Sequence, residues 1–229
     1  MKDMERRYIS DAIEMRGLPG QGAVLTGHAA VFDAIVNLYG SFREQILRGA
    51  FKKTIKEADV RALFNHDPNH VLGRNKSGTL RLIEDDTGLA YEVDLPDTQF
   101  ALDLAKSIDR GDVSQSSFAF DVTKETWDYP KGEDAELPLR SIKEVKLWDV
   151  SPVTYPAYEG TDVDLQRALR SLAIDLARPL DELVAAAKEG RLRDTTPEPD
   201  PEPDEIHSEP TREPGWKVRA RRELELLTL

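Results

Sequence analysis

A change in the residue pattern between Tyr158 and Asp162 divides the chain into two parts. Before the change, short runs of β-branched and aromatic residues alternate with turn residues, which is typical of β structure. After it, two amphipathic helical stretches follow, VDLQRALRSLAIDLA and PLDELVAAAKEG. The sequence therefore predicts a domain over residues 1–160 that is mainly β with flanking helices (α+β), followed by a helical extension over residues 161–193.

The first part contains several segments with clear secondary-structure signals. Helices are expected over residues 51–58 and 98–110, where apolar side chains recur at helix spacing, and Thr98 or Asp97 can cap the second helix. Strands are expected in the segments that are rich in β-branched and aromatic residues, namely residues 23–32, 42–47, 60–65, 79–83, 89–95, 116–126 and 139–150.

The end of the chain is acidic and poor in apolar residues. Residues 194–214 include the run PEPDPEPDE, a composition that predicts a disordered acidic linker. Residues 215–229 regain helix spacing and predict a short terminal helix that orders only against a partner, because so short a helix is marginal in water. We expect this extension to serve delivery or self-processing; a solubilising tail without a partner is the alternative.

Composition excludes several classes of protein. The net charge of -12 disfavours direct binding to nucleic acid, because phosphates are themselves negative. The chain has no cysteine, so a cysteine nucleophile, a disulfide framework and thiolate zinc sites are excluded. Neither a signal peptide nor an apolar run of the roughly 20 residues that a membrane span needs is visible, so we expect an intracellular, soluble protein.

His66 is the first candidate catalytic residue. It follows an apolar strand segment in LFNHDPNHVLGR, where the strand would position it and the loop HDPNH would expose it, as a general base requires. A loop histidine without a task is the alternative. A third interpretation is a metal site, because His66, Asp67 and His70 form the pattern H-D-x-x-H, but Pro68 argues against the helix that would bring both histidines to one face.

Three serines form the second candidate group. Ser114, Ser116 and Ser117 lie in GDVSQSSFAF, where a predicted helix ends and a predicted strand begins. An element terminus can supply both the fixed backbone and the N–H groups that a nucleophile needs. Serines are also common at such junctions for purely structural reasons.

Asp149 is the third candidate. It lies in KLWDVSPVTYPA between apolar neighbours at the end of a predicted strand, so it could orient and charge-balance an imidazole. An acid on an edge strand is the alternative.

Four segments, taken in order, resemble the prohead maturation proteases of tailed bacteriophages, which are related in fold to the herpesvirus maturational proteases. FREQILRGAF is similar to an early segment of that family, LFNHDPNHVLGR to its histidine motif, VSQSSFAF to its serine motif, and LWDVSPVTYPA to its closing motif. The resemblance covers about residues 8–160. It implies a small β-barrel of the herpesvirus-protease type, surrounded by helices.

The resemblance also implies roles for individual residues. The catalytic serine falls on Ser117, the base on His66, and the acid on Asp149, where the family more often has Glu. Gln115 and Ser116 depart from the Gly-Met of the family motif, so a slipped alignment would make Ser116 the nucleophile. Backbone N–H groups near Arg74 are the expected holders of the oxyanion.

The implied function is that of a serine endopeptidase which cleaves scaffold or capsid-protein segments, and itself, inside assembling proheads in the host cytoplasm. The expected partners are the major capsid protein and scaffold segments, with a homodimer possible by analogy with the herpesvirus enzymes. No cofactor, metal, nucleic acid or membrane is expected. The alternatives are a catalytically inactive assembly scaffold and a metal-dependent hydrolase that uses His66 and His70.

Overall fold

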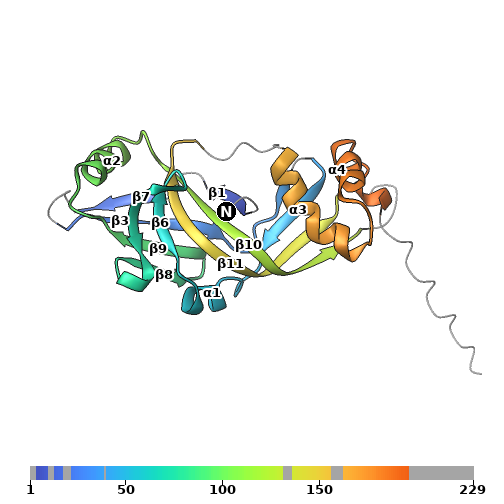
Figure 1. Ribbon diagram of the computed structural model, residues 1–229, viewed down its shortest axis with the longest axis horizontal. Helices are drawn as coiled ribbons and strands as arrows, with labels where there is room; N and C mark the ends of the chain where they lie inside the picture. Colours follow the sequence, from blue (N-terminus) through green and yellow to red (C-terminus); the bar gives the residue numbers. More distant parts are fainter. Residues whose placement is uncertain are drawn as a thin grey trace, which may run out of the picture. The chain divides into compact units, whose positions relative to one another are not determined.

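The computed structural model describes residues 4–9, 13–17, 22–38, 40–130, 136–155 and 162–195 (Figure 1). The terminal helix and the part of the acidic linker beyond Thr195 therefore lie outside the described residues. None of the described helices is long and apolar enough to cross a membrane.

The described strands form two sheets. The larger sheet has the central order β1-β10-β11-β5-β4, and β6 pairs with both β11 and β7. Its members are β1 (Glu5–Ile9), β4 (Val36–Leu38), β5 (Phe42–Ile46), β6 (Arg61–Phe64), β7 (Asp67–Arg74), β10 (Gln115–Asp128) and β11 (Leu139–Val153). The smaller sheet has the order β2-β3-β9-β8, from β2 (Ile13–Arg16), β3 (Val24–Val31), β9 (Gly88–Asp94) and β8 (Leu80–Glu84).

One hydrophobic core lies between the two sheets. Phe118 and Phe120 of β10 stack with ring centroids 4.8 Å apart and share this core with Leu25 of β3 and Tyr91 of β9. In the described part of the chain no hydrogen-bonded ladder joins the two sheets, and β4, β7 and β8 are edge strands. The prediction of a small closed barrel is therefore wrong for these residues: the core is made by two open sheets packed face to face.

The predicted helices are confirmed, and each end lies within about two residues of the predicted one. They are α1 (Lys52–Glu57), α2 (Gln99–Asp109), α3 (Asp162–Asp175) and α4 (Leu180–Lys188), with short 3₁₀ turns η1 (Asn75–Ser77) and η2 (Leu192–Thr195). Thr98 caps α2, because its hydroxyl accepts a hydrogen bond from the Ala101 N–H at 3.3 Å, which confirms one of the two expected caps. The strand predictions are confirmed as well, but β1, β2, β4 and β7 were not predicted.

Helices α3 and α4 share a second hydrophobic cluster with the larger sheet. Leu169 of α3 and Leu183 of α4 are fully buried together with Phe42 of β5, and the Ser41 hydroxyl donates to the Ala187 carbonyl at 2.6 Å. Residues 1–196 accordingly form one compact unit. The helices of the predicted extension cover one end of the sheet on which they pack (Figure 1).

We expect a chain that ends after Asp175 to be less stable than one that ends after Thr195. The shorter chain lacks Leu183 and Val184, whose burial against α3 contributes at least about 3 kcal/mol. Urea denaturation followed by circular dichroism measures the difference. Equal midpoints for the two truncated chains would contradict the shared core.

Candidate active site

The register of two paired strands places the candidate serine and aspartate on one face of the larger sheet. Ser117 of β10 lies opposite Ser151 of β11, and Ala119 lies opposite Asp149. Because alternate residues of a strand point to the same face, all four side chains share one side. Ser117 and Asp149 are thus brought together by strand pairing, although they are far apart in the sequence.

Ser116 faces the other way. Its side chain is fully buried, and its hydroxyl donates to the Tyr91 hydroxyl at 3.1 Å in the core between the sheets. Burial raises the pKa of Tyr91 despite the opposing effect of this hydrogen bond, so the phenol stays neutral. Ser114 lies just before β10 and does not line the cavity that Ser117 lines. The geometry therefore favours Ser117 over its neighbours.

His66 is presented by a tight turn. Asn65 and His66 form the two-residue loop of the β6–β7 hairpin, and their φ angles are 54° and 56°. Positive φ at both central residues is the requirement of a type I′ turn, and Asn and His adopt this conformation more readily than most residues. The predicted loop HDPNH is thus mostly strand: β7 begins at Asp67 and tolerates Pro68 because it is an edge strand.

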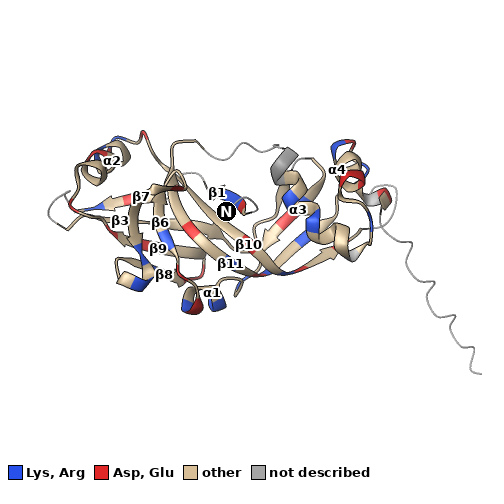
Figure 2. Ribbon diagram, viewed as in Figure 1, with Lys and Arg blue, Asp and Glu red and all other residues tan. Residues whose placement is uncertain are grey.

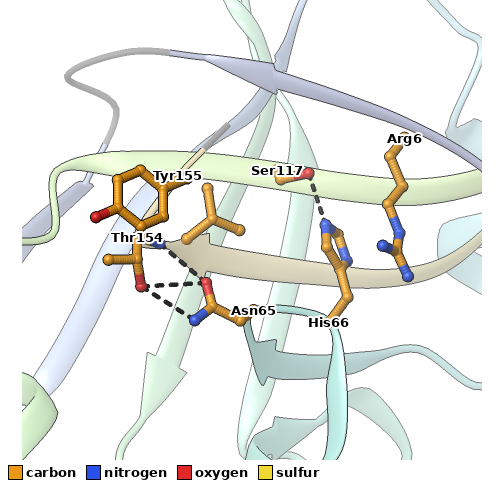
Figure 3. A pocket seen from close by; sticks show the side chains of 7 residues that line it. Arg6, Asn65, His66, Ser117, Thr154 and Tyr155 are labelled. Carbon is orange, nitrogen blue, oxygen red and sulfur yellow. Dashed lines mark hydrogen bonds between the residues drawn. The ribbon is translucent and has the colours of Figure 1, made fainter. Parts of the chain in front are cut away.

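Asn65 fastens this turn to the end of β11. Its backbone N–H donates to the Pro152 carbonyl at 3.0 Å, and its side-chain oxygen accepts from the Thr154 N–H at 2.9 Å. Its side-chain NH₂ donates to the Thr154 hydroxyl at 3.0 Å (Figure 3). The turn is therefore held by both the backbone and the side chain of the residue that precedes His66.

A continuous chain of hydrogen bonds links the candidates. His66 Nε2 lies 2.7 Å from Ser117 Oγ, and His66 Nδ1 lies 2.6 Å from Asp149 Oδ1. The Ser151 hydroxyl donates to the same Asp149 oxygen at 2.8 Å. With the imidazole neutral and its proton on Nδ1, Nε2 is free to accept the Ser117 proton.

The serine lies at the floor of a surface cavity. The cavity has a volume of about 350 Å³ and is lined by Arg6, Asn65, His66, Ser117, Val153, Thr154 and Tyr155 (Figure 3). Asp149 lies behind His66 with a side chain only 7% exposed, so the carboxylate contacts the imidazole but not the cavity. A substrate that enters therefore meets the hydroxyl and the outer edge of the imidazole.

Arg74 does not lie at the cavity, and the expected oxyanion contribution from this segment is not supported. Its backbone N–H donates to the Thr79 hydroxyl at 3.0 Å, and its guanidinium pairs with Asp59 at 2.7 Å. The physical reason is the β6–β7 hairpin, which continues as a strand through Arg74 and carries it away from the turn that holds His66.

His70 does not join His66 in a metal site. Its imidazole stacks on Phe100, with ring centroids 4.4 Å apart, and its Nδ1 pairs with Asp67 at 3.2 Å. Both ring nitrogens of His66 are engaged elsewhere. Throughout the described ranges, no three or more His, Asp or Glu side chains are grouped so as to hold a metal ion.

The site residues that were missed in the sequence include Ser151, Asn65, Arg6 and Thr154. Ser151 could have been found, because it follows Asp149 by two positions on a predicted strand and so shares its face. Asn65 carries a weaker signal, the preference of Asn for positive φ before a histidine. Nothing local points to Arg6 or Thr154, since their place depends on pairing with distant segments.

A hydroxyl in a cavity, linked through an imidazole to a buried carboxylate, is the arrangement that defines the serine hydrolases with a catalytic triad. Comparison with known proteins identifies a family within this class. The family model described as caudovirus prohead serine protease matches residues 11–173, most of the chain. The chain belongs to this family, and the membership supports a protease role in maturation of the prohead.

Among solved structures, the bacteriophage T4 capsid assembly protease is similar to this chain at 12% sequence identity. The match covers 67% of this chain and 98% of the T4 chain, with a TM-score of 0.45. No curated protein matches the chain.

Proposed function

We propose that this chain is a serine endopeptidase that cleaves scaffold or capsid-protein segments, and itself, during prohead maturation. The observation that carries the proposal is the unbroken hydrogen-bond chain from Ser117 through His66 to Asp149, in a member of the prohead protease family. An inactive scaffold would have no need to hold these three side chains in register. The fold relationship to herpesvirus proteases remains a prediction.

The proposed reaction begins with acyl transfer. Ser117 Oγ attacks the carbonyl carbon of the scissile peptide while His66 Nε2 takes the hydroxyl proton. Asp149, bonded to Nδ1, holds the imidazole tautomer and stabilises the imidazolium that forms. The imidazolium then gives its proton to the leaving amine as the C–N bond breaks, which leaves an ester between the substrate acyl group and Ser117.

Hydrolysis completes the cycle. Water attacks the ester carbonyl, His66 takes a proton from the water, and the same proton returns to Ser117 Oγ when the ester bond breaks. Ser151 supports this step indirectly, because its hydrogen bond to Asp149 helps to fix the carboxylate that orients His66. The enzyme returns to its starting protonation state.

A fluorophosphonate probe tests the proposal on the full chain. We expect covalent labelling at Ser117, equal labelling in the presence of a metal chelator, and equal labelling of a His70→Ala variant, because His70 packs on Phe100 outside the cavity. Mass spectrometry locates the modified residue. Labelling and cleavage that a chelator abolishes and zinc restores would favour the metal hydrolase, and a chain that neither labels nor cleaves would favour the scaffold.

A further inference from the structure

Three consecutive charged residues of β1, Glu5, Arg6 and Arg7, point alternately to the two faces of the larger sheet. Glu5 and Arg7 point into a buried charged cluster: Arg140 donates to Glu5 at 2.8 Å, and Arg7 donates to Glu44 at 2.6 Å. Because side chains alternate along a strand, Arg6 must point to the opposite face. Its two neighbours thus anchor the backbone on either side and prevent the strand from rotating Arg6 away.

The face to which Arg6 points is that of Ser117. Arg6 lies opposite Ala119 of β10, and Tyr8, two residues further along β1, lies opposite Ser117. Arg6 consequently lines the same cavity as Ser117 and His66 (Figure 3). In that view Arg6 stands on one side of the Ser–His pair, while Asn65, Thr154 and Tyr155 stand on the other.

Arg6 makes the cavity positive in an acidic protein. The residues that line the cavity include no carboxylate, and Arg6 supplies their one permanent charge, whereas the chain as a whole has a net charge of -12. The guanidinium has no hydrogen-bond or ion-pair partner within the described part of the chain. Elsewhere Lys and Arg are interspersed with Asp and Glu over strands and helices (Figure 2). Among the described residues, the charge at the cavity is therefore local and has no counter-charge beside it.

We infer that Arg6 is a specificity-determining residue that pairs with an acidic side chain of the substrate close to the scissile bond. The inference rests on the proposed function. A guanidinium offers a fork of donors that matches a carboxylate, and such charge-assisted pairs are the stronger hydrogen bonds of proteins.

The chemistry of the reaction adds a second reason. His66 becomes positively charged when it takes the Ser117 proton, and a bare cation in the same cavity opposes that charge. A substrate carboxylate bound to Arg6 neutralises the guanidinium and so removes its repulsion of the imidazolium. Peptides with an acidic residue at this position should therefore both bind better and react faster than their neutral counterparts.

The test compares cleavage profiles of full-length variants on a peptide library prepared from a bacterial proteome, read by mass spectrometry. Wild type should cut preferentially where Asp or Glu occupies one fixed position within about three residues of the cleaved bond. Arg6→Gln should lose this preference, Arg6→Lys should keep part of it, and Arg6→Glu should shift it to Lys or Arg. For a matched pair of Glu and Gln peptides, the ratio of kcat/KM values should fall by about 10–100-fold in Arg6→Gln.

Different outcomes overturn different claims. An identical profile in wild type and Arg6→Gln overturns the role of Arg6, as does an equal loss of kcat on every peptide, which would place Arg6 on the scissile carbonyl. Cleavage by Ser117→Ala at the wild-type rate overturns the proposed function alone, and a chain that cuts no peptide overturns both. Because Arg6 is exposed, thermal melting should show that its variants fold like wild type.

Discussion

Replacing Ser117 or His66 by Ala is expected to lower kcat/KM by about 10⁴–10⁶-fold, and combining the two changes should add little. The reason is that the hydroxyl and the imidazole act as one unit through the 2.7 Å contact between Oγ and Nε2. Asp149→Ala should cost less than either, because substrate binding and the attacking hydroxyl remain. Steady-state kinetics on a peptide from the library that wild type cleaves gives kcat/KM for the four full-length variants and for wild type.

Ser116→Ala is the matched control. The two serines are adjacent on β10 and equally buried, but the Ser116 hydroxyl bonds to Tyr91 in the core and cannot reach His66. This variant should keep activity within a few-fold of wild type and lose a little stability, since Tyr91 loses a partner. Activity that survives in Ser117→Ala but disappears in Ser116→Ala would reverse the assignment.

Ser117, His66 and Asp149, which form one hydrogen-bond chain, could be proposed from the sequence because each lies in a short motif, and the motifs follow in a recognisable order. Periodicity also identified β10, since Phe118 and Phe120 point to the core while Ser117 points away. The motifs could not predict the tight turn that presents His66. His66 was expected in a loop, but positive φ at Asn65 and His66 makes a two-residue hairpin, and local composition does not distinguish these cases.

Arg74 and Arg6 show where sequence reasoning fails. Backbone N–H groups near Arg74 were expected to hold the oxyanion, but β7 continues through Arg74, and a strand moves each residue about 3.3 Å further from the turn that holds His66. Arg6 was overlooked because it is remote from every motif. Only the antiparallel pairing of β1 with β10, a contact between the start and the middle of the chain, brings it to Ser117.

The buried charged cluster was also missed, although a signal existed. In FREQI of β5, Phe42, Glu44 and Ile46 all point inward, so an acid occupies a position where the alternation calls for an apolar residue. A buried carboxylate requires a cation, and its partner had to come from elsewhere in the chain. Arg140 is that partner, and it too occupies a buried position of its strand, β11, where an apolar residue would be expected.

Arg140 ties four strands of the larger sheet together. From β11 its guanidinium donates to Glu5 of β1 at 2.8 Å, to Glu44 of β5 at 2.9 Å and to Glu125 of β10 at 2.7 Å, and its side chain is 1% exposed. Burial alone would raise the pKa of Glu5, but the charges of Arg140 and Arg7 outweigh burial and lower it to about 2. Glu5 thus stays ionised inside the protein.

The sign of the pH dependence follows from this lowered pKa. A carboxyl whose pKa is lower in the folded than in the unfolded protein stabilises the fold above its unfolded value, which is 4.5 for Glu. As the pH falls from 4.5 towards 2, protons bind the unfolded chain first, and the contribution of Glu5 is lost. At neutral pH that contribution is on the order of 3 kcal/mol, and it requires Arg140.

Arg140→Ala is therefore expected to destabilise the protein by about 3–5 kcal/mol at neutral pH, because three buried carboxylates are left with Arg7 alone among the cations bonded to them. The deficit relative to wild type should shrink as the pH approaches 3, where protonation relieves the repulsion. Urea denaturation at several pH values measures both effects.

Arg81→Ala provides the matched control. Arg81 of β8 also pairs with two carboxylates of the neighbouring strand β9, but its side chain is 45% exposed, so its loss should cost only about 0–1 kcal/mol. Equal losses for the two variants would mean that Arg140 acts as a surface ion pair does, and β1 would then lack the anchor that holds Arg6 at the cavity.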